Sequence, residues 1–302
     1  MTEFTADAAA AETLGARPGR APWRVLVGAT WRQGRTKVGV AITLAIVAIA
    51  VIGPFFAPYS PTEFVAPPFS SPSSDVWFGA DNLGRDVLSR FLWGGRSVLV
   101  LSGLATLFGF VIGAIVGLVA AYSRGKLDDL LMRTMDVVLA FPQIVFALIL
   151  AATVGPKLWL LVVAVALTTV PRVARVARGA AVEVVERDFV RAADAIGVPR
   201  WRILFGEVLP NVTGPLVVEA SLRLSFNIAV IAGLSFLGFG LQPPSADWGL
   251  MINENKNGLT IQPWPVVLPV IAIGLLTIGT SLIGDGFARA SSGIERGGGE
   301  RG

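Results

Sequence analysis

Residues 97–122 read SVLVLSGLATLFGFVIGAIVGLVAAY, a run of 26 residues without a single charge. A transmembrane helix needs about 20 apolar residues to cross the hydrocarbon core, and it leaves no backbone group unpaired in lipid. The run therefore predicts a membrane-spanning helix. Within it Gly109, Gly113 and Gly117 recur every four residues on one face. This spacing predicts close packing against another helix, and the sequence leaves open whether that helix belongs to this chain or to a partner.

Five more apolar stretches are long enough, or nearly so, to cross a membrane. They are Val38–Phe56, Leu130–Thr153, Leu158–Ala174, Gly214–Gly240 and Trp264–Phe287. Of the 302 residues, 53% are hydrophobic and 15% are charged, against about 25% charged residues in soluble domains. The predicted fold class is an all-α polytopic membrane protein with six transmembrane helices.

The composition excludes several functions. The chain has no cysteine and no histidine, so a disulfide, a Cys/His metal site and a Ser–His–Asp triad are impossible. The net charge of +4 is small and the basic residues lie between apolar blocks, so nucleic acid is not an expected partner. No Gly-x-x-x-x-Gly-Lys-Ser/Thr loop is present to hold phosphates. We predict no catalytic residue, no metal site and no cofactor bound by this chain. Because the phosphate-binding loop is absent, the energy for any transport must come from a partner protein or from an ion gradient.

The loop charges predict the orientation in the membrane. Of the 25 basic residues, nineteen fall on the side that carries both termini, and an excess of Lys and Arg marks the cytoplasmic side. We therefore expect both termini in the cytoplasm, with the first span an uncleaved anchor. Trp23, Val27 and Trp31 recur at helical spacing just before that span, which predicts a short interfacial helix.

These expectations divide the chain into segments. They are a cytoplasmic arm with the interfacial helix (1–37), a six-helix domain (38–287) with external loops 57–96 and 241–263 and a cytoplasmic loop 172–210, and a cytoplasmic tail (288–302).

The cytoplasmic loop 172–210 has the most specific pattern. Ala192, Ala193, Ile196 and Gly197 lie at helical spacing, a break follows at Gly197 and Pro199, and a second helical turn leads to Leu209–Pro210. A small-residue helix followed by a break predicts a compact knob that fits a groove in another protein. The alternative is a basic linker that binds lipid headgroups, and five acidic residues among the seven arginines weaken it.

This loop resembles the EAA loop of ABC importer permeases. The stretch Arg191-Ala-Ala-Asp-Ala-Ile-Gly197, then nine residues, then Glu207-Val-Leu-Pro210 has the spacing of that motif. Arg191 replaces its first Glu and Glu207 replaces an Ile. The resemblance implies contact with an ATPase through Arg191, Ala192, Ala193, Asp194, Gly197, Leu209 and Pro210.

Two other stretches resemble the dipeptide/oligopeptide-type permeases, and in particular their C-type subunit. They are Trp77–Arg90, in the first external loop, and Leu234–Gly249, around the end of the fifth span. The resemblance implies a heterodimer with a second permease, two ATPase subunits that use ATP and Mg, and an extracytoplasmic solute-binding protein. It also implies docking of that binding protein near Asp81, Gly84, Arg85, Asp86 and Trp248. The alternative for the external loop is a packed lid on the helix bundle, and the two can coexist.

Charged residues inside spans are costly and mark functional sites by default. Glu219 and Arg223 lie four residues apart, which lets their side chains meet. They form either an internal ion pair or a polar lining of a translocation path, and the sequence leaves both open. Arg133 and Asp136, one turn apart, are expected to form a structural pair.

The function that these features favour is an ATP-driven import permease for di- or oligopeptides in the cytoplasmic (inner) membrane. The alternatives are an ion-coupled secondary transporter, an ABC permease for a non-peptide solute such as nickel or glutathione, and a membrane scaffold. A lone carrier needs no knob at Arg191–Pro210, and we see no internal repeat of the kind that secondary carriers often show.

Overall fold

The structure, a computed structural model, describes residues 23–123, 125–155 and 157–299. Within these ranges no β-strand occurs, and only two isolated bridges join Phe64 to Arg85 and Ala80 to Asp86. The helices are α2 (Trp23–Trp31), α3 (Gly34–Ile52), α4 (Val87–Ser123), α5 (Lys126–Leu139), α6 (Gln143–Val154), α7 (Leu158–Val185), α8 (Asp188–Ala195), α9 (Arg200–Ile203), α10 (Leu209–Asn211), α11 (Thr213–Phe236), α12 (Trp248–Asn255) and α13 (Trp264–Gly299). The predicted all-α membrane fold is confirmed.

In the part of the chain that the structure describes, five segments are long and apolar enough to cross a membrane: Gly34–Phe56, Val87–Ser123, Leu158–Val185, Thr213–Phe236 and Trp264–Ser291. The predicted span Leu130–Thr153 is instead two helices, α5 and α6, whose axes are bent by 80° at the break. Pro142 lies in that break. Its ring clashes with the preceding turn of a helix and it has no N–H to donate, which favours a break in a stretch that looked continuous.

Three predicted boundaries shift because helices continue into the predicted loops. The α4 helix begins at Val87 rather than Ser97, since the Asp86 carboxylate accepts the backbone N–H of Ser89 at 2.7 Å and caps the helix. The α7 helix runs to Val185, through the first fourteen residues of the predicted loop 172–210. The α13 helix runs to Gly299 and takes in most of the predicted tail.

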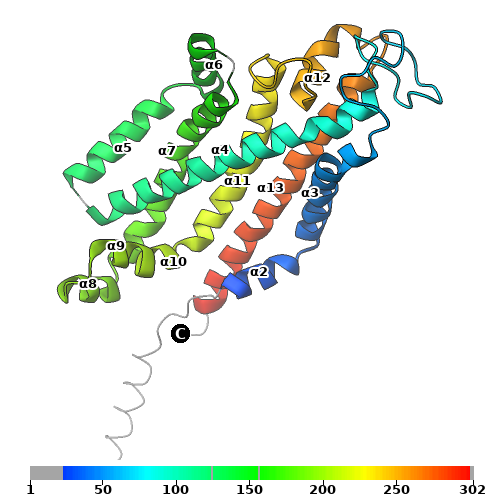
Figure 1. Ribbon diagram of the computed structural model, residues 1–302. Helices are drawn as coiled ribbons and strands as arrows, with labels where there is room; N and C mark the ends of the chain where they lie inside the picture. The colour runs from blue at the N-terminus through cyan, green and yellow to red at the C-terminus, as the bar shows by residue number, and fades with distance from the viewer. Residues whose placement is uncertain (1–22, 124, 156, 300–302) are drawn as a thin grey trace, which may run out of the picture.

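Each span reverses the direction of the chain, so the connecting segments gather at two ends. Figure 1 shows α2, α8, α9, α10 and the end of α13 at one end, with α6, α12 and the loop after α3 at the other. The predicted interfacial helix corresponds to α2, and Thr30 of α2 lies beside Gly286 of α13. The rest of the predicted arm, residues 1–22, lies outside the described residues.

The glycine face of α4 packs against α7. A Cβ atom added at Gly113 would lie 2.7 Å from both the Val170 carbonyl oxygen and the Val173 Cβ. Gly109 and Gly117 meet α7 in the same way, at Thr169 and Ala177. The predicted close packing is confirmed, and the second helix belongs to this chain.

Candidate functional site

The knob is the segment 188–210 at the foot of α7, which contains α8 and α9 (Figure 1). Gly197, which has a φ of +78°, ends α8. Its N–H donates to the Asp194 carbonyl, and the Val198 N–H donates to the Ala193 carbonyl, both at 3.0 Å. These two bonds satisfy carbonyls at the helix end and require a left-handed residue at Gly197. The glycine in the motif therefore sets the turn of the knob.

Buried apolar side chains fix the knob to the helix bundle. Val190 of α8, Ile203 of α9 and Val208 join one cluster with Ala181 and Val184 of α7. The same cluster includes Leu118 near the end of α4 and Leu216 near the start of α11, together with Ala121, Ala177, Val185, Leu204 and Val212. Because three long helices share this cluster, a force on the knob would act on all three.

The outer surface of the knob also carries large apolar side chains, among exposed charged ones. Ile196 is 80% exposed and Trp201 is 61% exposed, and Phe189 and Phe205 beside them in sequence are exposed as well. Large apolar side chains that gather on an exposed surface mark a contact with another protein or a membrane. The knob thus has a buried apolar side that holds it and an exposed apolar side that is left uncovered.

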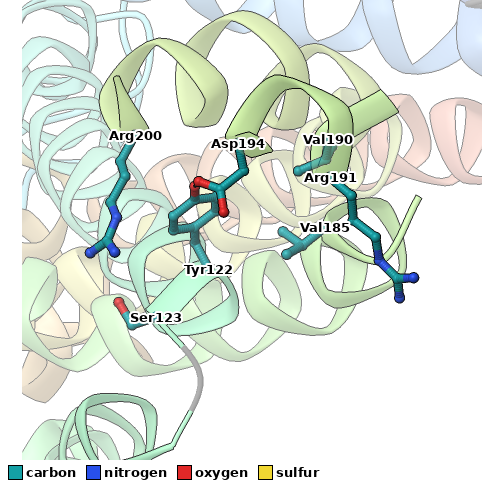
Figure 2. Close-up of a pocket in the computed structure, with 7 residues that line it drawn as sticks. All are labelled: Tyr122, Ser123, Val185, Val190, Arg191, Asp194 and Arg200. Atoms are coloured by element: carbon teal, nitrogen blue, oxygen red, sulfur yellow. The ribbon is translucent and has the colours of Figure 1, made fainter. Parts of the chain in front are cut away.

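A cavity of about 280 Å³ lies between the knob and the end of α4. Figure 2 shows its lining, with the Tyr122 ring and the Asp194 carboxylate facing one another. The Tyr122 hydroxyl donates to the Asp194 carboxylate at 2.8 Å, and the Arg200 guanidinium lies 6.0 Å from the centre of the Tyr122 ring. Arg191 extends away from this pair (Figure 2). The Tyr122–Asp194 bond gives α8 a direct polar link to α4.

The predicted coupling residues thus take different positions in the knob. Ala192, Gly197 and Pro210 are exposed, while Ala193 and Leu209 pack against the buried cluster. Arg191 and Asp194 line the cavity. Their contact with an ATPase stays a prediction.

Glu219 and Arg223 form the predicted ion pair within α11. The Glu219 carboxylate lies 2.8 Å from the Arg223 Nε, and the two side chains are 10% and 16% exposed. Their placement on a translocation path stays a prediction. The expected pair of Arg133 and Asp136 is wrong, because Asp136 pairs with Arg175 of α7 instead.

A second ion pair also connects α5 to α7. Arg178 donates to both carboxylate oxygens of Asp128, each at 2.6 Å. This bidentate geometry is the strong form of the interaction. With the Asp136–Arg175 pair, it holds the lower part of the broken span against α7.

A buried polar cluster near the centre of the bundle was not predicted. The Asn227 amide of α11 donates to the hydroxyls of Thr106 in α4 at 2.9 Å and Thr169 in α7 at 3.3 Å. Asn227 is fully buried. The sequence did offer a signal for this cluster, because Asn227 carries an amide within an apolar span and such groups form hydrogen bonds across helices in lipid.

At the opposite end, the loop 57–86 and α12 form a structure that we call the lid. Four of the five predicted docking residues are almost completely buried in the lid. They are Asp81, Arg85, Asp86 and Trp248, each no more than 1% exposed. Gly84, with a φ of +84°, is buried against the Ala66 carbonyl. A partner that docks from outside would touch the residues above them, so these five residues shape the lid from within.

The lid is held by a network of four buried charges. Arg85 reaches Asp81 at 2.7 Å and Glu254 at 2.9 Å, and Arg90 reaches the same two acids at 3.4 and 2.8 Å. The network was not predicted, because Glu254 lies more than 160 residues from Arg90. The network joins the loop 57–86, the start of α4 and α12.

Asp247 is the other fixed point of the lid. Its carboxylate accepts the N–H of Leu250 at 3.0 Å, which caps α12, and also accepts the hydroxyls of Ser97 and Ser235. Trp248 then donates its indole N–H to the Phe91 carbonyl at 2.9 Å. The lid, α4 and α11 are therefore joined at one buried carboxylate.

Comparisons with known proteins agree with this architecture. Residues 109–292 match the family described as binding-protein-dependent transport system inner membrane component. The chain is 37% identical to the glutathione transport system permease protein GsiD of Pectobacterium atrosepticum, over 90% of this chain and 91% of that protein. It is 33% identical to the dipeptide transport system permease protein DppC of Alkalihalophilus pseudofirmus, over 89% of each.

Two further matches extend these findings. The di/tripeptide transport system permease protein DppC of Pseudomonas aeruginosa is 36% identical, over 83% of this chain and 86% of that protein. Among solved structures, a chain of the MetNI methionine ABC transporter in an inward-facing conformation superposes with a TM-score of 0.52 at 21% identity. That match covers 66% of this chain and 96% of the other, and it shows a shared fold.

Proposed function

The chain belongs to the family of binding-protein-dependent transport system inner membrane components and is a permease subunit of an ABC importer, and we propose that its substrates are small peptides. Two of the relatives described above carry names for dipeptide or di/tripeptide transport. A third is named for glutathione. The sequence analysis grouped glutathione with non-peptide solutes, but it is a tripeptide with one unusual linkage. Glutathione is thus the second candidate substrate, and it shares a free carboxylate with the others.

The proposed assembly contains a second permease subunit, two ATPase subunits and an extracytoplasmic binding protein. In it this chain forms half of the translocation path, and ATP with Mg is used by the ATPase subunits. The support from sequence is that the chain has no phosphate-binding loop. The support from structure is the knob, whose exposed apolar surface has no cover among the described residues.

In the proposed orientation the knob and both termini face the cytoplasm of an inner membrane, and the lid faces outward. Most basic residues lie toward the knob end, which is the charge bias of cytoplasmic loops. Arg187, Arg191, Arg200 and Arg202 are in or beside the knob itself. The knob then lies on the side of the ATPase subunits, and the lid lies on the side of the extracytoplasmic binding protein.

The observation that carries the proposal is the exposed apolar surface of the knob around Ile196 and Trp201. We expect Ile196→Glu to reduce peptide uptake at least tenfold, because a carboxylate would have to be buried in the ATPase groove. Co-purification of the ATPase subunits should fall with it. The purified permease should unfold at its wild-type temperature, since Ile196 contributes little to the core at 80% exposure.

Lys126→Glu is the matched control. It places a carboxylate on an exposed residue at the corner between α4 and α5, outside the segment 188–210. We expect it to leave uptake and ATPase association within about twofold of wild type. Normal uptake and normal association in Ile196→Glu would overturn the assignment of the knob.

A further inference from the structure

Arg172 lies in the middle of a membrane-spanning helix, although the sequence analysis placed it where the last residues of a predicted span overlap the start of the cytoplasmic loop. It is the fifteenth of the 28 residues of α7. At a rise of about 1.5 Å per residue it lies about 21 Å from the outer end of that helix, within the roughly 30 Å of the hydrocarbon core. A charge at this depth is expensive and indicates a functional site.

No acidic side chain among the described residues pairs with Arg172. Its guanidinium lies 5.4 Å from the centre of the Phe226 ring on α11, a cation–π distance. Arg175 and Arg178, the next arginines of α7, each have an aspartate partner. Arg172 therefore differs from its neighbours on the same helix.

The acidic residue of the facing helix α11 is paired with another arginine. Glu219 pairs with Arg223 at 2.8 Å, and Arg172 acts on Arg223 as a like charge. The three residues together thus carry one uncompensated positive charge. A fixed excess of positive charge inside a span needs an anion or water beside it.

Arg172 lies where one side of α7 changes from buried to exposed. One turn earlier on the same side of α7, Thr168 and Thr169 are buried, and Thr169 is bonded to Asn227 of α11. From Arg172 onward this side is exposed, and the facing stripe of α11 at Leu222 and Phe226 is exposed too.

A second exposed face, between α4, α5 and α7, has the opposite character. It contains a groove of about 670 Å³ that includes Phe108, Met135 and Val163 and has no charged residue in its lining. Such a surface suits lipid or another apolar helix. The charged face with Arg172 is the one that water and a polar solute would occupy.

We infer that Arg172, held against Phe226, binds the carboxylate of the transported peptide as it passes through the membrane. This inference rests on the proposed function, in which the solute is a small peptide. The planar guanidinium can donate two parallel hydrogen bonds to a carboxylate. Phe226 keeps the guanidinium oriented between transport events. The positive charge of the nearby Arg223 disfavours the binding of a cation at this place.

The test uses the assembled transporter in proteoliposomes, with its binding protein and ATPase subunits. Uptake of alanyl-alanine is compared with uptake of alanyl-alanine amide, which lacks the carboxylate. The same binding protein is used with every permease variant, so its preference for one of the two peptides is the same in all of them. A change in the ratio of acid to amide uptake between variants therefore reports the permease. We expect Arg172→Gln to lower this ratio about tenfold, the effect of losing a hydrogen bond to a charged group.

Arg175→Gln is the matched control, because it removes the same charge one turn along α7 from a residue that already has a partner. Its acid-to-amide ratio should equal that of wild type. Arg172→Lys keeps a cation and should retain more uptake of the free dipeptide than Arg172→Gln. This comparison decides the question if amide uptake falls below detection.

Three results would overturn the inference. They are an unchanged ratio in Arg172→Gln, equal losses in Arg172→Lys and Arg172→Gln, and loss of the second permease from the purified complex. The last would show that Arg172 pairs with an acid of that subunit. Failure of the wild-type transporter to import either peptide would instead overturn the proposed function.

Discussion

The lid and the knob reverse the usual distribution of residues in different ways. The lid buries charge, since Asp81, Arg85 and Arg90 are all at most 1% exposed. The knob exposes large apolar side chains at Ile196 and Trp201. Buried charges that pair with distant segments hold parts of one chain together. Exposed apolar side chains make no such contact within the chain and are available to another protein. The lid is thus internally complete, and the knob is complete only in an assembly.

The sharpest test of this contrast is to break the lid network at Glu254. Glu254→Ala leaves Arg85 and Arg90 with one acid between them, and an uncompensated buried charge typically costs about 3–5 kcal/mol. We expect a loss of that order in the free energy of unfolding of the purified permease, measured in detergent by denaturant titration. Lys256→Ala, a nearby exposed substitution, should cost less than about 0.5 kcal/mol. Equal effects of the two variants would show that the network does not stabilise the lid.

The second test asks whether the buried pair in α11 behaves like the lid. Arg223→Leu leaves Glu219 without its partner and should cost about 3 kcal/mol. The double change Glu219→Leu with Arg223→Leu should recover most of that stability, because no lone charge remains. We expect the double variant to take up peptide poorly, since its path would lack a polar lining. A stable double variant with wild-type uptake would make the pair purely structural.

The smallest effect on stability is expected in the knob. Trp201→Ala changes an exposed side chain and should alter the free energy of unfolding by no more than about 0.5 kcal/mol. The amount of ATPase that co-purifies should nevertheless fall, because large aromatic residues contribute strongly at interfaces. A large loss of stability with normal ATPase binding would remove the contrast between knob and lid.

Much of the knob could be predicted from its sequence because its structure is local. The break at Gly197 follows from a left-handed turn, and the bonds that form it connect residues three and five positions apart. The membrane spans could be predicted for the same reason, since hydropathy over about 20 residues is a local property of the sequence. The division of Leu130–Thr153 was missed although Pro142 was visible, because a proline bends some membrane helices and ends others depending on what packs around it.

The error at the end of α7 has a cause in packing. The predicted span Leu158–Ala174 ended where arginines begin, yet α7 continues because its small residues Ala174, Ala177 and Ala181 are buried against other helices. Hydropathy averages over all faces of a helix, whereas packing acts on one face. Arg172 was placed at the end of a predicted span for this reason.

The sequence by itself determined the class of protein, the approximate spans, the ends at which their connections meet and the place of the knob. Hydrophobic periodicity and short-range turn chemistry are sufficient for these features. Only the tertiary structure decided that Glu254 meets Arg90, that Asn227 joins three helices and that Arg172 has no acid beside it. Those facts depend on which helix faces come together between residues far apart in the chain, and local periodicity does not specify that.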